Sequence, residues 1–210
     1  MAMGVMAVAF NFKDVAEDEF HDWYDTEHLP ERRRLNGFVT LQRWIGIEDP
    51  KVAVATYDLA TPEVLESSAY RAISGENLSP WSKRVVARCQ RIVRFEGEQL
   101  LPGDKSAPSD AAALLLVGMN VSPEAEQEFN RWYNEEHLPA LASVPGVLCA
   151  RRFRGTRSPL KYLALYHLSS PQVCGSTTWK QAVETPWTRR MHEHVRDRLR
   201  IVCNAYRREA

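Results

Sequence analysis

The sequence predicts an α+β protein in which two similar halves of one chain close into a single barrel. Three observations lead to this prediction. The chain has 210 residues, enough for two units of about 100 residues each. One motif occurs twice, as EFHDWYDTEHLP from Glu19 and as EFNRWYNEEHLP from Glu128. The first apolar segment of each half is apolar at consecutive positions, so both faces of that strand need burial.

Composition excludes several classes of protein. Lys and Arg number 27 and Asp and Glu number 27, so a net charge of 0 gives no overall field to attract nucleic acid or an anionic membrane. A hydrophobic content of 44% excludes a disordered chain. No apolar run reaches the roughly 18 residues of a membrane span. The N-terminus lacks the basic region of a signal peptide, and four scattered cysteines without a CxxC pair are typical of reduced thiols, so we expect a cytoplasmic protein.

The repeat divides the chain. The two copies are 109 residues apart, and this offset extends beyond the motif to pairs such as Tyr57 with Tyr166. It drops to 106 where Ser79-Pro80-Trp81 matches Thr185-Pro186-Trp187, and we expect it to return to 109 in the last strand, where Arg91-Ile92-Val93 matches Arg200-Ile201-Val202. The segment PGDKSAPSD has the composition of a linker. The predicted units are therefore residues 1–101 and 111–210, joined by a linker at 102–110.

Each half is predicted to contain the same series of elements. In the first half, apolar and turn patterns predict strands at 5–12, 38–47, 52–59 and 91–95, and helices at 16–34, 62–73 and 80–88. In the second half they predict strands at 114–121, 147–154, 162–168 and 199–205, and helices at 125–144, 172–183 and 186–195. This βαββαβ order is that of a ferredoxin-like unit.

The apolar strands predict how the halves combine. Residues 5–10 and 114–119 would leave an apolar sheet face in water if each half had helices on one side only. At roughly 25 cal/mol per Å² of apolar surface, exposing such a face would cost more than the net stability of a domain. We therefore expect the two sheets to cover each other as an intramolecular α+β barrel, and we expect a ligand cavity inside it.

The repeated motif places a carboxylate among aromatic residues. On a helical wheel, Glu27 lies in the middle of the stripe formed by Phe20, Trp23 and Tyr24. A buried carboxylate needs a partner, and the candidates are Arg43 and the backbone N–H groups that open the turn at Pro80-Trp81. For Glu136 the corresponding candidates are Arg152 and the Pro186-Trp187 turn. Alternatively, the only role of Glu27 is to tie its helix to a loop. In either case we predict Glu27 and Glu136 to be buried acids with a structural role.

His28 and His137 lie at the edge of the same stripe. Pro30 disfavours helix at the residue before it, so His28 is expected in the last turn or at a kink, where its ring could reach a pocket. The histidine could act as a general acid or base, or it could close the helix against a loop. With Arg43 and Arg152, the two histidines are the candidate catalytic residues.

Further repeated side chains are candidates for substrate binding. Asn11 and Asn120 end apolar strands and could line the cavity or bind a loop. Aromatic residues could form its walls or fill the core. The candidates are Asn11, Asn120, Tyr24, Tyr133, Trp81 and Trp187.

No metal site is expected. His192 and His194 are two apart on a helix and so point about 200° apart, which makes them poor joint ligands. The sequence also lacks a Gly-rich phosphate loop and a GxSxG nucleophile motif.

The motif WYxxEHLP, followed by G-[FV]-[VL]-x-x-x-R-[WF] in both halves, resembles the dimeric α+β barrel superfamily, with EthD-like and uncharacterised members as the nearest relatives. Most members build one barrel from two chains, and many act without a cofactor on small aromatic molecules. The superfamily also contains chlorite dismutase-like haem proteins, whose proximal histidine lies late in the chain. Neither His192 nor His194 can be placed at that position, so the resemblance implies no cofactor.

Two functions follow from this resemblance. The first is a cofactor-free lyase, isomerase or monooxygenase that acts on a planar apolar or aromatic substrate in the barrel cavity. The alternative is a non-catalytic ligand-binding or stress-response protein whose repeated motif is structural. The expected partner is a small molecule, with no nucleic acid and no membrane, and the tandem barrel could form a homodimer. Differences between the halves bear on this choice, because catalysis needs only one intact site and the other half could diverge. In the alignment of the repeat, His21 corresponds to Asn130, Thr40 to Cys149, Gln42 to Arg151, and Asp58 to His167.

Overall fold

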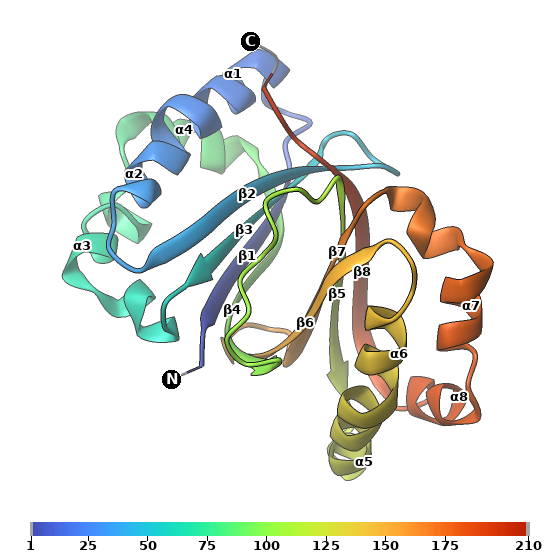
Figure 1. Ribbon diagram of the computed structural model, residues 1–210. Coiled ribbons are helices and arrows are strands. Elements are labelled where there is room, and N and C mark those ends of the chain that lie inside the picture. The colour runs from blue at the N-terminus through green and yellow to red at the C-terminus, as the bar shows by residue number, and fades with distance from the viewer. Residues whose placement is uncertain (1, 209–210) are drawn as a thin grey trace.

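The computed structural model describes residues 2–208 and has a mixed α+β fold, with eight antiparallel strands closed into a barrel and helices outside it (Figure 1). Around the barrel the order is β1-β3-β2-β8-β5-β7-β6-β4. The strands are β1 (Gly4–Asn11), β2 (Phe38–Gly46), β3 (Val52–Leu59), β4 (Gln90–Leu101), β5 (Ala113–Val121), β6 (Val147–Arg157), β7 (Tyr162–Leu168) and β8 (Val195–Ala205). One chain therefore supplies the whole barrel, as predicted.

The barrel has two seams between the N-terminal and C-terminal parts of the chain. In the N-terminal part, β1 pairs with β3 and β4, and β2 pairs with β3. In the C-terminal part, β5 pairs with β7 and β8, and β6 pairs with β7, so each part contains four strands paired with one another. The seams are β2 with β8 and β4 with β6. Unpaired strand edges would attract other chains, and closing both seams leaves no such edge in the barrel.

Alternation along each strand explains the consecutive apolar residues. On β1, Val5, Ala7 and Ala9 belong to the core inside the barrel, whereas Met6 and Val8 belong to a core under the helices. The inside is filled by side chains from both parts of the chain, including Trp44, Phe95, Leu116, Phe153 and Leu165. The expectation of a ligand cavity inside the barrel is therefore wrong. A cavity of about 510 Å³ lies outside the sheet instead, beneath the helices of the N-terminal part.

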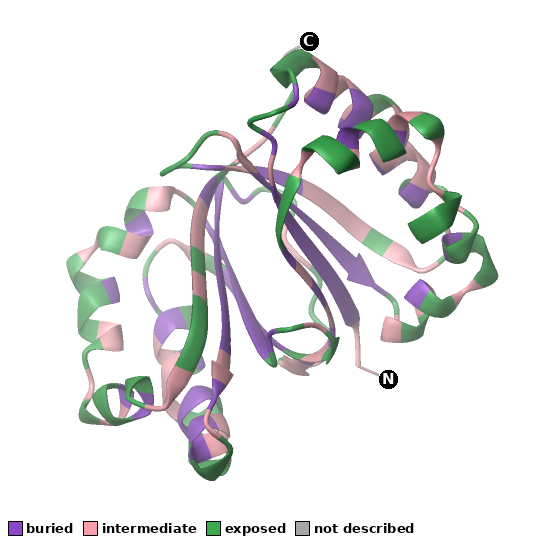
Figure 2. Ribbon diagram, turned by 180° about the vertical axis from the view of Figure 1, so that it is seen from behind, coloured by how far each residue is buried: buried purple, intermediate pink, exposed green. Residues whose placement is uncertain are grey.

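The helices form two groups on the outside of the barrel, and their exposed faces point away from the strands (Figures 1 and 2). None of the helices in residues 2–208 is long and apolar enough to cross a membrane. The helices are α1 (Glu17–Trp23), α2 (Leu29–Arg33), α3 (Ser68–Arg71), α4 (Pro80–Arg88), α5 (Glu126–Trp132), α6 (Leu138–Ala142), α7 (Thr177–Val183) and α8 (Pro186–His192), with 3₁₀ turns at Pro62–Glu66, Gly75–Asn77, Pro123–Ala125 and Pro171–Gly175.

The repeated motif forms a π-helical turn in both parts of the chain. The predicted helix at 16–34 is divided into α1, a π turn at Tyr24–His28 and α2, and a second π turn occupies Tyr133–His137. The Leu29 N–H bonds the Tyr24 carbonyl five residues earlier, where an α-helix would use the fourth. A proline within an α-helix has no N–H and its ring crowds the carbonyl four residues earlier, so the wider turn relieves the strain at Pro30.

The strand register corrects the alignment of the two halves. β1 pairs Val8 with Arg94, and β5 pairs Val117 with Arg200. Because Val8 and Val117 are 109 residues apart, the counterpart of Arg200 is Arg94, three residues later than the sequence match to Arg91 suggested. The offset therefore stays at 106 through the last strand.

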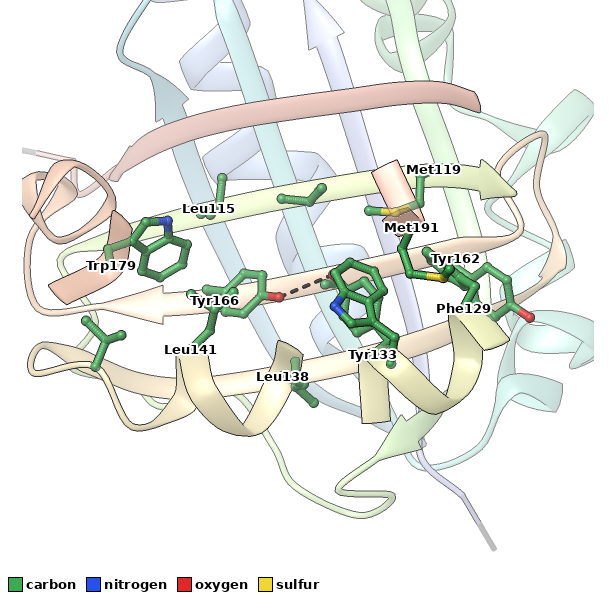
Figure 3. Close-up of a cluster of buried hydrophobic side chains, with 14 of the residues drawn as sticks. Leu115, Met119, Phe129, Tyr133, Leu138, Leu141, Tyr162, Tyr166, Trp179 and Met191 are labelled. Carbon is green, nitrogen blue, oxygen red and sulfur yellow. Dashed lines mark hydrogen bonds between the residues drawn. The ribbon is translucent and has the colours of Figure 1, made fainter. Parts of the chain in front are cut away.

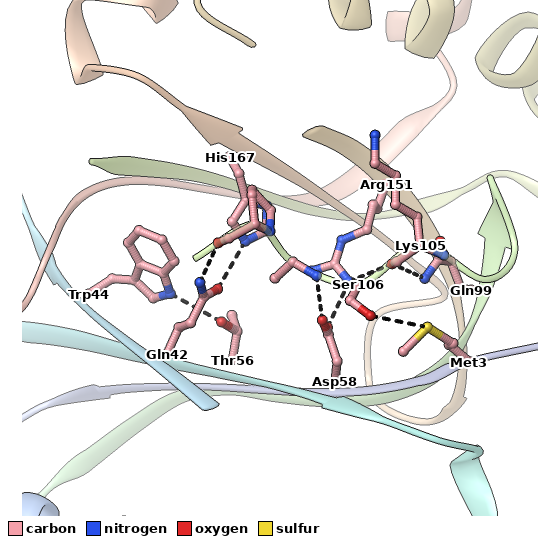
Figure 4. A network of polar contacts seen from close by, with 12 residues as sticks. Met3, Gln42, Trp44, Thr56, Asp58, Gln99, Lys105, Ser106, Arg151 and His167 are labelled. Atoms are coloured by element: carbon pink, nitrogen blue, oxygen red, sulfur yellow. Dashed lines mark hydrogen bonds and ion pairs between the residues drawn. The ribbon is translucent and has the colours of Figure 1, made fainter. Parts of the chain in front are cut away.

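The linker at 102–110 crosses the barrel and binds its inner polar residues (Figure 4). The Gln42 amide donates to the Pro108 carbonyl at 2.7 Å, and the Gln99 amide donates to the Lys105 carbonyl at 2.9 Å. The Ala107 N–H donates to Asp58 Oδ2 at 2.6 Å. The linker is thus part of the packed structure and satisfies polar groups that the strands bury.

Candidate functional site

A cavity of about 510 Å³ lies between the sheet and the helices of the N-terminal part. Its apolar wall comes from Met6, Val8 and Phe10 on the outer face of β1, and Leu65 and Val86 close it from the helical side. Cavities that bind drug-sized ligands are about 300–1,000 Å³, so this one can hold a small organic molecule.

Besides Tyr70, whose hydroxyl accepts from Arg94, three polar rings line the cavity. Tyr24 and His28 come from the π turn, and Tyr57 comes from β3. The His28 ring packs against Trp23 and Tyr24 at centroid distances of 4.5 and 5.0 Å. Its Nδ1 is buried without a hydrogen-bond partner. The motif thus builds one edge of the cavity from residues four apart.

Electrostatics keep these rings neutral. Burial, helped by the nearby cations of Arg32 and Arg94, holds the pKa of His28 well below its usual value. Burial also raises the pKa of Tyr24, and it raises the pKa of Tyr57 well above its usual value. At neutral pH the cavity therefore offers an uncharged imidazole and two phenols that can donate hydrogen bonds.

Arginines form the rest of the wall. On β4, Arg94 donates to Glu96 and to the Tyr70 hydroxyl, the latter at 2.9 Å. Arg32 is buried beside the π turn and donates to the His28 carbonyl at 2.9 Å. The other lining arginines are Arg71, Arg91 and, from β6 across the seam, Arg157.

A second cavity occupies the corresponding place in the C-terminal part but has only about 120 Å³. The Tyr133 and Tyr166 hydroxyls lie 3.2 Å apart in it, surrounded by Leu115, Met119 and Trp179 (Figure 3). His137 lines this cavity, and its burial lowers its pKa to about 3. Here Leu141 takes the place of Arg32, and the bulkier Trp179 takes that of Tyr70.

The two predicted catalytic arginines lie elsewhere. Arg43 donates to Asp25 Oδ1 at 2.5 Å and contacts His21 Nδ1 at 2.6 Å, so it does not pair with Glu27 as predicted. Arg152 is fully buried and donates to the side-chain oxygens of Asn134 and Asn130. Each guanidinium also lies over a motif tyrosine, 4.5 Å from the ring centroid. Neither lines the two cavities, because these strand positions face the places where α1 and α5 pass into the π turns.

Glu27 ties the π turn to the start of α4. Its Oε1 accepts from the Ser79 hydroxyl at 2.5 Å and from the Ser82 hydroxyl at 2.9 Å, and Ser82 in turn accepts from the Trp23 indole. Glu27 therefore binds the turn at Pro80-Trp81, as one of the two predictions had it, but the groups that donate to its carboxylate are serine hydroxyls and not backbone N–H groups. Glu136 accepts from Thr185 at 2.6 Å in the same place. Both glutamates are half-buried, less than predicted.

The remaining predicted binding residues are divided. The tyrosines Tyr24 and Tyr133 line the cavities. Asn11 instead donates to Asp49, and Asn120 donates to the Pro159 carbonyl and to Asp197, so both asparagines bind loops. The two predicted tryptophans, Trp81 and Trp187, pack at the edges of the helical cores and line neither cavity.

The C-terminal cavity does not fit a haem. Its volume of about 120 Å³ is far below that of a site for a large ligand. His192 lines it only from an exposed position, and His194 is engaged at 3.2 Å with Ser122. Within residues 2–208, no group of three or more His, Cys, Asp or Glu side chains is placed to hold a metal ion.

Comparison with known proteins connects this geometry to a fold. No protein-family model matches the chain, and no curated protein matches its sequence. The fold is similar to those of solved structures over nearly the whole chain. A protein named as a chlorite dismutase matches with a TM-score of 0.69 and 8% identity, covering 99% of this chain and 96% of that one.

Two further similar structures are named after oxidase or monooxygenase activities. An anthrone oxidase-like protein matches with a TM-score of 0.64 and 13% identity, covering 97% of this chain and 92% of that one. A protein of Fusobacterium nucleatum named as a monooxygenase matches with a TM-score of 0.64 and 11% identity, covering 98% of this chain and 93% of that one. The chain therefore shares the antiparallel α+β barrel architecture of these monooxygenase-like and chlorite dismutase-like proteins.

The sequence analysis missed most of the cavity's charged lining. Arg94 was hidden by the three-residue shift in the alignment of the last strand. Arg32 and Arg157 have no arginine counterpart, so the repeat gave no signal for them. A pattern that could have helped is the alternation Arg94, Glu96, Glu98 on β4, which places charges on the face of the strand opposite the buried Val93 and Phe95.

Proposed function

We propose that the N-terminal cavity is the active site of a small-molecule enzyme that acts on a planar aromatic or otherwise apolar substrate. One observation carries this proposal: a neutral His28 and two protonated tyrosines meet beside the apolar wall of a cavity large enough for such a molecule. A general base and hydrogen-bond donors around one ligand are the basic requirements of proton-transfer catalysis.

The chemistry best matched to these groups is removal of a proton from an acidic carbon or phenol of the substrate. His28 accepts the proton, and Tyr24 and Tyr57 donate hydrogen bonds to the oxygen on which negative charge develops. The depressed pKa of His28 makes it a weak base in the empty cavity. An anion that forms beside it opposes the effect of burial and raises the affinity of the ring for a proton.

The resulting carbanion or enolate can isomerise, lose a leaving group or react with dioxygen. The names of two structural neighbours, an anthrone oxidase-like protein and a monooxygenase, favour the last route. We therefore propose a cofactor-free oxygenase as the leading reaction type. The reducing environment implied by four free cysteines favours a cytoplasmic enzyme.

The proposal includes a tandem origin of the barrel. Residues 1–101 and 111–210 would be two ferredoxin-like halves fused by the linker. Both halves have the same strand order, the same π turn and a cavity in the same place, which supports this interpretation. Only the N-terminal half would remain catalytic, because its cavity is the larger one.

Anthrone is a suitable first substrate for the test. Its oxidation consumes one O₂ and yields anthraquinone and one water, so oxygen uptake and anthraquinone absorbance report the same reaction. We expect the protein to accelerate both above the spontaneous rate and His28→Gln to abolish most of that acceleration. Rates equal to the protein-free control for anthrone and for a panel of related phenols would contradict the oxygenase proposal.

A non-catalytic role is the second candidate. The motif residues pack on each other in both halves, since His137 contacts Trp132 and Tyr133 as His28 contacts Trp23 and Tyr24. These ring contacts would stabilise the π turn in each half even if neither histidine took part in a reaction. Tight binding of an aromatic ligand in the N-terminal cavity without turnover would favour a binding protein.

A further inference from the structure

The N-terminal cavity has an unusual charge for a protein whose formal net charge is 0. Five of its lining residues are arginines and two are glutamates, a difference of three positive charges. We refer to these five as the arginine cluster: Arg32, Arg71, Arg91, Arg94 and Arg157. An apolar substrate alone gives no reason to gather cations around its binding site.

Three members of the cluster have acidic partners. Arg94 is paired with Glu96, and Arg32 lies 3.3 Å from Glu31. Arg157 pairs at the surface with Glu66 at 2.7 Å. These three charges are therefore partly compensated before a ligand arrives.

Arg71 and Arg91 differ from the others. Both are exposed at the mouth of the cavity, and neither forms an ion pair with another residue in the described range 2–208. Of the two acids in the lining, Glu96 pairs with Arg94, and Glu76 is exposed in the 3₁₀ turn Gly75–Asn77. The mouth therefore has two guanidinium groups available for a ligand and one carboxylate.

The strand register orders these groups along the cavity. Arg91 lies beside Phe10, Arg94 lies beside Val8, and Glu96 lies beside Met6. The Arg91 guanidinium lies 5.9 Å from the centroid of the Phe10 ring, and Arg94 and Glu96 flank the rest of the apolar wall from β4. His28 and the two tyrosines line the same cavity from the helical side and from β3.

We propose that the ligand of this cavity is an aromatic carboxylic acid, whose carboxylate binds Arg91 and Arg71 while its ring lies against Met6, Val8 and Phe10. This inference rests on the proposed function, because it names the substrate class of the same site. Guanidinium groups bind carboxylates through paired, charge-assisted hydrogen bonds, and Arg94 adds positive potential along the path. The second cavity also has two lining arginines, Arg198 and Arg200, but its volume of about 120 Å³ is too small for such a ligand.

The test compares an acid with its uncharged amide. The probes are 2-naphthoate and 2-naphthamide, with benzoate and benzamide as a smaller pair, titrated into ¹⁵N-labelled full-length protein. The Gly75 amide reports on the first cavity, and the Trp179 indole reports on the second. We expect 2-naphthoate to shift Gly75 and to bind at least about tenfold more tightly than the amide.

Substitutions identify the groups responsible. Arg91→Gln and Arg71→Gln should each weaken binding of the acid about tenfold and leave binding of the amide unchanged. Both arginines are exposed, so these variants should fold normally. The matched controls are Arg84→Gln, on the exposed face of α4, and Arg200→Gln, the counterpart of Arg94 in the second cavity; neither should change the affinity of the acid.

The possible results are distinct. Equal affinity of acid and amide at Gly75, or an acid affinity that survives both substitutions, overturns the carboxylate inference and leaves the cavity as a site for neutral aromatics. A failure of both probe pairs to shift Gly75 overturns this inference and the proposed function together. Selective acid binding without turnover of any aromatic acid would support the inference and contradict only the proposed enzyme.

Discussion

Arg151 on β6 donates from Nη1 to Oδ1 of Asp58 on β3 at 2.7 Å, and both side chains are buried inside the barrel. The facing pair is Gln42 with His167, whose side chains lie 3.3 Å apart. Gln42 and Arg151 are 109 residues apart, as are Asp58 and His167. The same two repeat positions therefore meet twice across the barrel, once as an ion pair and once as a neutral pair (Figure 4).

Breaking the ion pair should be costly. We expect Arg151→Met alone to lower the free energy of unfolding by about 3–5 kcal/mol, because it leaves the Asp58 carboxylate buried with a single backbone donor. The double variant Asp58→Leu with Arg151→Met should recover most of that loss. Urea denaturation measures both. The control is Glu66→Gln, which removes an exposed pair with Arg157 and should cost less than about 1 kcal/mol.

The Glu27 contacts should also contribute to stability. Glu27→Ala removes the acceptor of two hydroxyl groups and should destabilise the protein by about 1–3 kcal/mol. Glu27→Gln keeps an acceptor oxygen and should cost less. The control variant is Glu19→Ala, on the exposed side of α1, where only a surface pair with Arg88 is lost. Equal melting temperatures for Glu27→Ala and wild type would mean that these hydrogen bonds contribute nothing net.

Arg43 and Arg152, which lie beneath the helices at equivalent positions of the two parts, provide a matched comparison. Arg43 has a carboxylate partner in Asp25, whereas Arg152 has the neutral amide of Asn134 in the same place, and burial lowers the pKa of Arg152. Asn134→Asp should therefore stabilise the protein by up to about 1 kcal/mol, and Asp25→Asn should destabilise it by a comparable or larger amount. Chemical denaturation at low salt would measure both. Destabilisation by Asn134→Asp would show that the amide is the better partner.

His167 should make stability depend on pH. Burial lowers its pKa from 6.5 to about 3, so the folded protein keeps the ring neutral where the unfolded chain binds a proton. The resulting stability is complete above pH 6.5 and is lost as the pH falls toward 3, at up to about 1.4 kcal/mol per pH unit. His167→Gln should reduce the loss between pH 7 and pH 4.5, measured by urea denaturation. His194→Gln, on a half-buried ring outside the barrel, is the control.

The histidines of the motif should differ in function. His28→Gln should lower turnover of a substrate of the N-terminal cavity by about 10²–10⁴-fold, the usual contribution of a general base. His137→Gln should leave turnover nearly unchanged, because the cavity beside it is too small for the same ligand. Circular dichroism would establish that both variants are folded. Normal turnover in the double variant would make both histidines structural.

The sequence by itself determined the architecture and the position of the motif. Consecutive apolar residues in the first strands required burial of both sheet faces, and the repeat indicated that one chain could supply both sheets. Pro30 indicated a disturbance of the helix near His28. These inferences depend on local pattern and on solvent exposure, and both are encoded in short stretches of residues.

Only the tertiary structure decided where the site lies and how it is charged. Side chains from both halves fill the barrel, so the space for a ligand is left beneath the helices. Arg43 and Arg152 face the junctions of α1 and α5 with the π turns instead of the cavity, and a three-residue shift in the last strand brings Arg94 there. Arg157 reaches the cavity only because β6 pairs with β4 across the seam. Such juxtapositions depend on strand register and on contacts between residues far apart in the chain, which a repeated motif does not specify.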